Sequence, residues 1–270
     1  MFATDRSMDV VDLAVEAEAR GFESLWIPEH THIPTSRITP PPTGEEELPE
    51  EYKRTLDPLV VLAAAAATTS TIRLGTGIML PAQREPIVTA KAIATLQNLS
   101  RGRFQLGIGF GWNADEMGHH GVDYSRRREV TREHLLAMQA LWNDEVAEFH
   151  GEFVDFGPSW SWPKPQVPVP VFLGGGAGPK LFSHVAEYAT GWLPIGGSGL
   201  AAAIPQLREA VSAASRNPDA IEVIAFGSVP TREKIEHFDA IGVTECVIRL
   251  PSVGRDEALR VLDHYVGFVR

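Results

Sequence analysis

The sequence predicts a parallel α/β barrel of the TIM type, in which strands and helices alternate along the chain. Seven short apolar segments are typical of buried strands, and helical patterns separate them. Parallel strands need a covering crossover, which is usually a helix. Two predicted strands end in residues suited to chemistry, His30 and the glycine cluster that begins at Gly174. In such a barrel both would lie on the face that carries active sites.

The first half of the chain contains three predicted strands. Over residues 8–20, Val10, Leu13, Ala14 and Ala17 share one helical face, and Gly21 suits the left-handed position that ends a helix. Strands are predicted at residues 24–27, 72–80 and 103–109, and further helices at 56–67, 88–99 and 126–142. The spacing therefore alternates strand and helix from the start.

The second half continues this alternation. Strands are predicted at residues 169–173, 192–195, 223–226 and 245–250. A helix is predicted to begin at Pro179, because proline suits the first helical position, and it carries Leu181, Val185 and Tyr188 at core spacing. An open doubly wound sheet would fit the same periodicity. We favour the barrel because the candidate site residues are spread over several strand ends and do not converge on one switch point.

The number of strands leaves one question open. A closed barrel of this type has eight strands, and the sequence supplies seven full ones. Residues 1–7 are too short for another strand with its loop. Either residues 1–4 form a truncated first strand, or the barrel is completed in some other way. We expect one barrel domain over residues 1–270, with long connections at 31–55 and 143–167.

Composition excludes several classes of protein. The formal net charge of −11 argues against a nucleic-acid-binding surface, which needs a basic face. No apolar run approaches the roughly 18 residues of a membrane span, and the first residues show no signal-sequence pattern. The lone cysteine, Cys246, cannot form an internal disulfide. We therefore expect a cytoplasmic protein that binds a small molecule, with no nucleic acid or membrane as partner.

His30 is the candidate catalytic residue. His30 and His32 alternate along an extended segment, so their side chains would point the same way and could bind a metal. The later strand ends offer no further histidine or aspartate ligands, so the sequence predicts no metal site. A neutral imidazole can donate or accept a proton, which favours His30 as an acid–base residue. The neighbouring pair His119 and His120 is expected at the surface.

Two glycine-rich segments follow predicted strands. The segment Gly174, Gly175 and Gly176 leads into the helix at Pro179, and its amides and the helix start suit a phosphate. The segment 107–111 is similar but lacks the rest of a dinucleotide fingerprint, which disfavours nicotinamide. The three arginines at 126–128 are expected to form a solvated helix start.

The connection 143–167 carries more aromatic surface than a loop usually leaves in water. Two interpretations stay open, a lid or wall above the barrel end and a contact between subunits. In the first, Trp160 and Trp162 would line a substrate pocket together with Trp112.

Four segments resemble the bacterial luciferase-like monooxygenase superfamily. They are GFESLWIPEH at residues 21–30, RLGTGI at 73–78, LSRGRF at 99–104 and GIGFGWN at 107–113. With the glycine cluster and Gly191-Trp192, the resemblance extends to about residue 194. The nearest group looks like the branch of oxidoreductases that depend on the deazaflavin coenzyme F420.

This resemblance implies a site for coenzyme F420, or for FMN as the alternative. His30 would lie beside the reactive ring carbon. The bond between Gly77 and Ile78 would be the non-proline cis peptide that forms a bulge behind the ring. Phe110 and Gly111 would line the path to the phosphate, and the amides of residues 174–176 would surround it.

The implied activity is hydride transfer between F420 and an unidentified small organic substrate, with His30 handling a proton. One alternative is an FMN-dependent monooxygenase that uses a separate reductase, and another is a non-catalytic barrel that binds flavin or deazaflavin. Trp112 stands where sugar-phosphate dehydrogenases of this branch carry a catalytic glutamate, so oxidation of such a sugar is not expected. Paired subunits are common in the family, so we also expect a homodimer.

Overall fold

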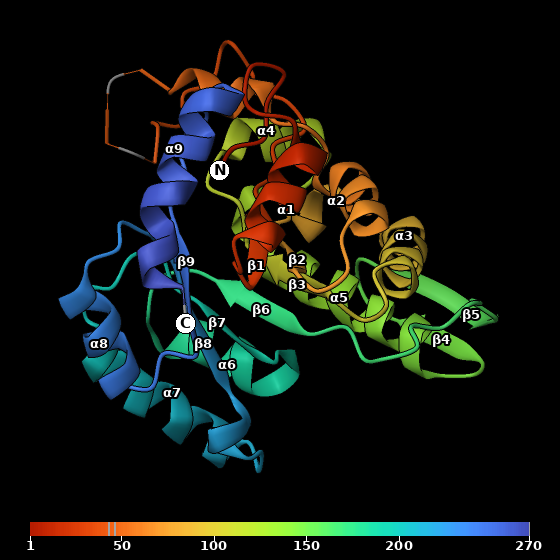
Figure 1. Ribbon diagram of the computed structural model, residues 1–270. Helices are drawn as coiled ribbons and strands as arrows, with labels where there is room; N and C mark the ends of the chain where they lie inside the picture. The colour runs from red at the N-terminus through yellow and green to blue at the C-terminus, as the bar shows by residue number, and fades with distance from the viewer. Residues whose placement is uncertain (43, 46, 270) are drawn as a thin grey trace.

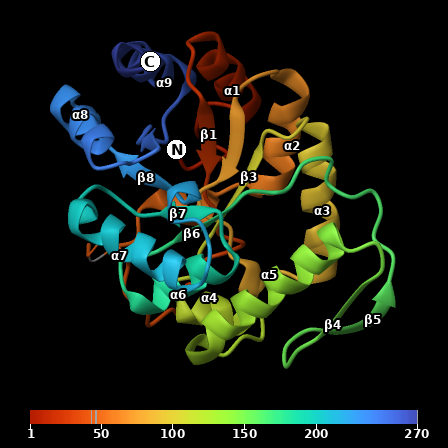
Figure 2. The ribbon, with the colours of Figure 1, turned by 90° about the horizontal axis from the view of Figure 1, so that it is seen from below.

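The computed structural model describes residues 1–42, 44–45 and 47–269 and contains a ring of parallel strands (Figure 1). Neighbouring strands pair in the order β1 (Ser24–Ile27), β2 (Arg73–Thr76), β3 (Phe104–Ile108), β6 (Val171–Gly174), β7 (Gly191–Leu193), β8 (Glu222–Ser228) and β9 (Glu245–Ile248). Every pairing in this seven-stranded sheet is parallel. The view along the ring shows the helices outside the strands (Figure 2). The predicted TIM-type barrel is therefore confirmed, as a nearly closed one.

The helices connect the strands and cover them. They are α1 (Val10–Ala19), α2 (Pro58–Thr68), α3 (Pro86–Leu99), α4 (Ala114–His119), α5 (Arg127–Asn143), α6 (Pro179–Tyr188), α7 (Leu200–Ala213), α8 (Arg232–Ala240) and α9 (Arg255–Tyr265). Short 3-10 turns are η1 (Glu50–Arg54), η2 (Pro81–Gln83), η3 (Tyr124–Arg126), η4 (Pro218–Ala220) and η5 (Val266–Phe268). Asp9, Asp57 and Glu85 cap the helices α1, α2 and α3 by accepting backbone hydrogen bonds from the first turn.

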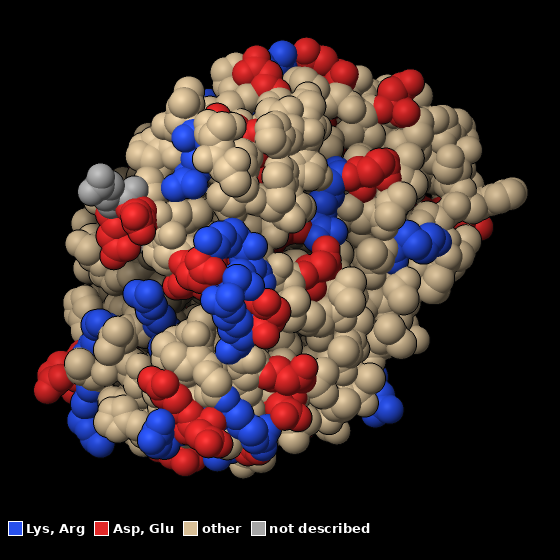
Figure 3. Space-filling model, turned by 90° about the horizontal axis from the view of Figure 1, so that it is seen from above, with Lys and Arg blue, Asp and Glu red and all other residues tan. Residues whose placement is uncertain are grey.

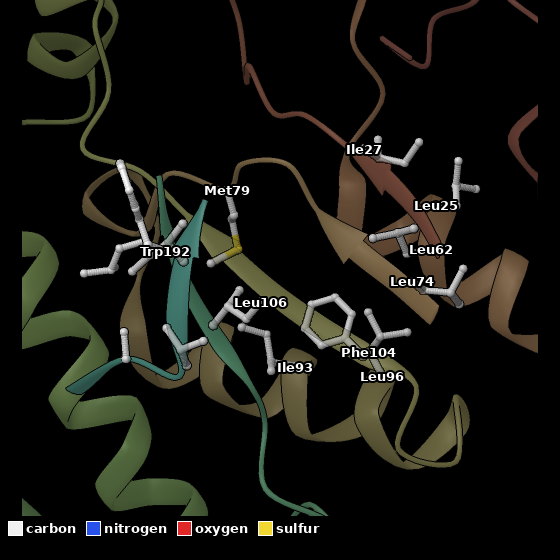
Figure 4. Close-up of a cluster of buried hydrophobic side chains, with 14 of the residues drawn as sticks. Leu25, Ile27, Leu62, Leu74, Met79, Ile93, Leu96, Phe104, Leu106 and Trp192 are labelled. Atoms are coloured by element: carbon white, nitrogen blue, oxygen red, sulfur yellow. The ribbon is translucent and has the colours of Figure 1, made fainter. Parts of the chain in front are cut away.

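The hydrophobic core lies between the strands and the helices that surround them. Figure 4 shows part of it, where Leu74, Phe104 and Leu106 of β2 and β3 meet Leu62 of α2 and Ile93 of α3. These side chains are fully buried. Each such side chain contributes about 1.5–3 kcal/mol relative to exposure, so this packing holds the strand ends at fixed positions.

The ring has a gap between β1 and β9, which do not pair with each other in the described part of the chain. A cavity of about 210 Å³ lies there, lined by residues of β1, β9 and the helices α1, α8 and α9. Thr4 forms an isolated antiparallel bridge with Thr55. Residues 1–4 thus form no strand that pairs with β1 or β9 in the described part of the chain, and Thr4 instead bridges to the segment before α2.

The two long connections differ in structure. Residues 31–55 contain η1, and residues 143–167 contain the antiparallel hairpin of β4 (Ala147–His150) and β5 (Asp155–Ser159). The hairpin lies outside the barrel, beside α5 and α3 (Figures 1 and 2). It therefore does not cover the end of the barrel that carries α4. None of the described helices has the length and apolar character needed to cross a membrane.

Candidate active site

The predicted site residues follow the ends of four neighbouring strands, β1, β2, β3 and β6. His30 comes after β1, Gly77 and Ile78 after β2, Phe110 and Gly111 after β3, and Gly174, Gly175 and Gly176 end or follow β6. Because these strands are parallel and adjacent, their carboxyl ends lie side by side. Acidic and basic side chains are interspersed over this end of the molecule (Figure 3).

His30 forms a buried pair with Glu116 of α4. The imidazole Nδ1 lies 2.9 Å from Oε2 of Glu116. The side chains are 7% and 1% exposed, respectively. The backbone of His30 is held by Thr55, whose Oγ1 donates to the His30 carbonyl at 2.8 Å and accepts from its N–H at 3.2 Å. The ring is therefore fixed both through its backbone and through Nδ1.

The residue before His30 forms a second buried pair. Glu29 accepts hydrogen bonds from the Arg84 guanidinium and, at 2.7 Å, from the backbone N–H of Leu80. Burial raises the pKa of the Glu29 carboxyl, and the charge of Arg84 opposes that shift. Arg84 also binds Asp57, the cap of α2. This pair ties the end of β1 to the segment after β2.

Aromatic rings surround the imidazole. The ring centroids of Tyr52 and Trp112 lie 5.4 and 5.9 Å from that of His30. Tyr52 and Trp112 are 6.2 Å apart and nearly perpendicular. Burial raises the pKa of the Tyr52 hydroxyl. The predicted substrate-pocket residue Trp112 therefore does lie beside His30, and Tyr52 joins it from η1.

The bond between Gly77 and Ile78 is a cis peptide, as the resemblance implies. The Ile78 side chain lies against the ends of β3 and β6. A Cβ atom on Gly109 would be 1.8 Å from Cδ1 of Ile78, and one on Gly174 would be 3.1 Å from its Cγ2. Glycine at these positions leaves the space that the Ile78 side chain fills.

A group of polar side chains from α5 and α6 meets Phe110. The Arg128 guanidinium lies 4.3 Å from the ring centroid of Phe110, and the ring centroid of His184 lies 5.5 Å from it. Nη1 of Arg128 and the hydroxyl of Tyr188 are buried and have no hydrogen-bond partner within the described residues. Burial lowers the pKa of Arg128 and of His184 and raises that of Tyr188. Buried donors without partners are rare, and they suit an anionic ligand.

The glycine segment after β6 leads directly into α6. The indole N–H of Trp192 in β7 donates to the carbonyl of Gly175 at 2.9 Å, which ties the glycine segment to β7. Gly175 has φ +146°, a region that side chains rarely adopt. A Cβ on Gly176 or Gly178 would meet nothing within 4 Å, and no side chain caps α6. The first turn of α6 thus keeps its backbone N–H groups available to a ligand.

Trp160 and Trp162 do not belong to this group. They follow β5 and are 78% and 58% exposed. The carbonyl of Trp162 accepts a hydrogen bond from Lys91 on α3, and Lys164 lies over its ring. The structure therefore separates them from Trp112 and places them on the outside of the barrel.

His32, His119 and His120 form a polar network with Thr31 at α4. Nε2 of His32 lies 2.9 Å from Nδ1 of His119, and Oγ1 of Thr31 lies 2.8 Å from Nε2 of His120. His119 and His120 are exposed, as expected from the sequence. Within the residues that the structure describes, no group of three or more metal-ligating side chains could hold an ion.

Sequence reasoning missed Glu116, Tyr52 and Arg128. The arginines at 126–128 were expected to be solvated, but only Arg126 fits that description, with surface ion pairs to Glu129 and Glu152. Glu116 stands at the third position after the cap Asn113, where a glutamate usually closes a capping box. Here its side chain turns to His30 instead.

These features define a parallel α/β barrel with a polar site at the carboxyl ends of its strands, and comparison with known proteins identifies the family. The sequence profile described as "Luciferase-like monooxygenase" matches residues 3–241. The chain therefore belongs to the luciferase-like monooxygenase family, as the sequence resemblance suggested.

Several relatives are similar over much of the chain. The Mycobacterium tuberculosis protein Rv0953c is 43% identical over 261 residues, which cover 96% of this chain and 93% of that protein. The F420-dependent glucose-6-phosphate dehydrogenase of Kineococcus radiotolerans is 31% identical over 79% of this chain and 61% of that enzyme. The family thus includes enzymes that use coenzyme F420.

Solved structures agree with the fold. An F420-dependent secondary alcohol dehydrogenase in complex with an F420-acetone adduct superposes with a TM-score of 0.78 at 18% identity, covering 100% of this chain and 98% of that one. The oxygenating constituent of 3,6-diketocamphane monooxygenase from Pseudomonas putida, in complex with FMN, gives a TM-score of 0.61 at 20% identity, covering 86% of this chain and 65% of that one. At these identities the likeness concerns the fold alone.

Proposed function

We propose that this protein is an oxidoreductase that transfers a hydride between coenzyme F420 and a small organic substrate. The observation that carries the proposal is the set of buried polar side chains at the carboxyl ends of β1, β2, β3 and β6. A buried imidazole held by a carboxylate lies at one side, and a buried guanidinium nitrogen and hydroxyl that have no hydrogen-bond partner among the described residues lie at the other. The relatives named as F420-dependent dehydrogenases favour F420 over FMN.

The residues present fit such a cofactor. A deazaflavin with a phosphate-bearing tail needs donors for its anionic end and a surface of small residues along its path. Arg128 and Tyr188 supply buried donors, and the residues 174–176 supply backbone without side chains. Phe110 lies beside Arg128 and His184 and would contact the tail. Ile78 and Gly77 would lie behind the ring, and His30 beside it.

When bound, F420 supplies the acceptor or donor of the hydride. The chain's own residues handle the proton. As the hydride leaves the carbon of an alcohol substrate, the hydroxyl proton passes to Nε2 of His30, and a carbonyl product remains. In the reverse direction His30 returns that proton to the oxygen. Tyr52 and Trp112 shield the imidazole and limit the entry of water.

An FMN-dependent monooxygenase is the second candidate, because Arg128 and Tyr188 would suit the phosphate of FMN equally well. Titration of the purified protein with F420 and, separately, with FMN, followed by fluorescence quenching, distinguishes them. We expect micromolar or tighter binding of F420. Micromolar binding of FMN alone would overturn the choice of cofactor.

A variant of His30 tests the catalytic assignment. We expect His30→Ala to bind F420 within a few-fold of the wild type and to lose most of its turnover with a substrate found by screening alcohols and carbonyl compounds. Unchanged turnover would remove the assigned role. Bound F420 that no compound reduces or oxidises would favour the non-catalytic barrel.

A further inference from the structure

The two buried glutamates near His30 differ in what balances their charge. Glu29 binds Arg84, so a cation already compensates it. Glu116 is fully buried, and within the described residues its only ion-pair partner is His30. Its other oxygen, Oε1, is buried and has no hydrogen-bond partner in the same part of the chain. Among the described residues, His30 is therefore the one side chain that forms a hydrogen bond or ion pair with the Glu116 carboxylate.

We infer that Glu116 is a positioning residue, which fixes His30 in the form that carries hydrogen on Nδ1 and leaves Nε2 free to exchange a proton with the substrate. The inference rests on the proposed function for its consequence in turnover. Its structural part does not depend on which cofactor binds.

The hydrogen-bonding chemistry decides the tautomer. An ionised carboxylate only accepts hydrogen bonds, so at 2.9 Å from Oε2 of Glu116 the Nδ1 atom must be the donor. A neutral imidazole has one donor and one acceptor nitrogen, which makes Nε2 the acceptor. Nε2 makes no hydrogen bond to any described residue. The proton-accepting nitrogen is thus the one left for the substrate.

The charges support the same role. When His30 takes a proton, a positive charge forms on a side chain that is only 7% exposed. A buried charge without a partner is costly, whereas a carboxylate at hydrogen-bond distance compensates it. Glu116 can give this compensation because no arginine or lysine of the described chain pairs with it.

Helix α4 holds Glu116 in place from two sides. The side chain of Asn113 caps the helix by accepting from the N–H of Glu116 at 3.3 Å. Asp115 accepts hydrogen bonds from the backbone N–H and the hydroxyl of Thr39 at 3.1 and 2.8 Å. The carboxylate therefore meets His30 from a rigid support and does not depend on a freely moving loop.

The test compares Glu116→Gln with Glu116→Asp, and uses Glu129→Gln as the control that removes a surface carboxylate of α5. Nitrogen-15 NMR of the histidine rings reports which nitrogen carries hydrogen, and His30→Gln identifies the signals of His30. In the wild type we expect Nδ1 to be protonated and Nε2 bare. A glutamine amide can either accept from Nδ1 or donate to it, so Glu116→Gln should give a mixture of tautomers.

The kinetic part follows from the tautomer. We expect Glu116→Gln to lower kcat about 10- to 100-fold with KM within about threefold, as for the loss of a residue that orients an acid–base group. Glu116→Asp should keep the tautomer and recover part of kcat, and it decides the question if the glutamine variant does not fold. Glu129→Gln should match the wild type.

The two proposals can fail separately. If the wild type shows no turnover with F420, the proposed function fails, while the NMR measurement still tests Glu116. If His30 has the same tautomer and turnover in Glu116→Gln as in the wild type, the role of Glu116 is overturned and the proposed function stands.

Discussion

Substituting Gly109 by alanine tests whether Ile78 borders the cofactor site. The new Cβ atom would lie 1.8 Å from Cδ1 of Ile78, far inside the 3.5–4.0 Å at which carbon atoms are in favourable contact. The obstacle is the terminal methyl of a side chain, which can move by adopting another rotamer. Alanine at Gly107 differs, because its Cβ would lie 2.1 Å from the backbone carbonyl oxygen of Thr76.

Gly107→Ala should therefore lower the free energy of unfolding more than Gly109→Ala does. An altered Ile78 rotamer and imperfect packing cost about 1–2 kcal/mol. For Gly107→Ala, strand β3 must move away from β2, and we expect about 3 kcal/mol or more. In a chain of this size each 1 kcal/mol corresponds to about 2–4 °C in Tm. Because the moved Ile78 would enter the space behind the proposed ring, Gly109→Ala should also weaken F420 binding about tenfold.

The assay combines urea unfolding with cofactor titration. Gly157→Ala in the hairpin strand β5 is the control, since a Cβ there meets nothing within 4 Å, and it should leave the free energy of unfolding unchanged within about 0.5 kcal/mol. Adding Ile78→Ala to Gly109→Ala should restore part of the stability. If Gly109→Ala binds F420 as tightly as the wild type while Ile78 has moved, Ile78 does not border the ring, and the assignment of Gly77 and Ile78 is refuted.

Three further predictions concern binding, pH and assembly. Arg128→Gln should weaken F420 binding about 10- to 100-fold by removing a charged donor, whereas Arg126→Gln should not; equal affinity in titrations of both would exclude Arg128 from the site. Burial opposes the charge of Glu18, but hydrogen bonds from the amides of residues 70–72 outweigh it and lower its pKa from 4.5 to about 2. This stabilisation is present above pH 4.5 and is lost as the pH falls through about 2. Glu18→Gln should therefore reduce the free energy of unfolding by about 1–2 kcal/mol at pH 7, and this loss should shrink steadily between pH 4.5 and pH 2 in urea titrations. Light scattering should give twice the chain mass of 29.5 kDa, because exposed Val60 and Val88 on α2 and α3 suit a homodimer contact, and a monomer at micromolar concentration would contradict it.

The barrel strands were predictable from sequence because they are short, mostly buried and bounded by polar or glycine turns, whereas the exposed hairpin strands β4 and β5 were not predicted. β1 was predicted with its observed bounds, and β3 and β8 within a few residues. The strand predicted at 72–80 ends at Thr76, although Met79 still bridges to Ile108 of β3. α4 has six residues, which is too short to show a helical period, and α7 has so many alanines that its apolar face is poorly marked.

The site was predictable only where it depends on strand ends. Parallel strands bring their carboxyl ends together, so His30 and the glycine cluster at Gly174 could be placed on one face from the strand order, whereas Gly77, Ile78, Phe110 and Gly111 were implied only by the family resemblance. Glu116 and Arg128 come from helices, and which residue of a helix reaches the barrel end depends on the orientation of that helix. The aromatic content of residues 143–167 likewise does not show whether Trp160 faces the barrel end or the outside of the barrel.

His30 follows a strand at the edge of the gap, and the structure shows why its position is nevertheless well defined. β1 pairs only with β2 among the described strands, so the backbone N–H and C=O groups on its other edge have no partner strand. Beyond Ile27 the chain is held by other contacts, because the Glu29 carboxylate accepts hydrogen bonds from Arg84 and from the backbone N–H of Leu80. Thr55 and Glu116 then fix His30 itself. Loosening β1 at the gap should therefore change the stability of the barrel more than the geometry of the imidazole, since none of these four contacts crosses from β1 to β9.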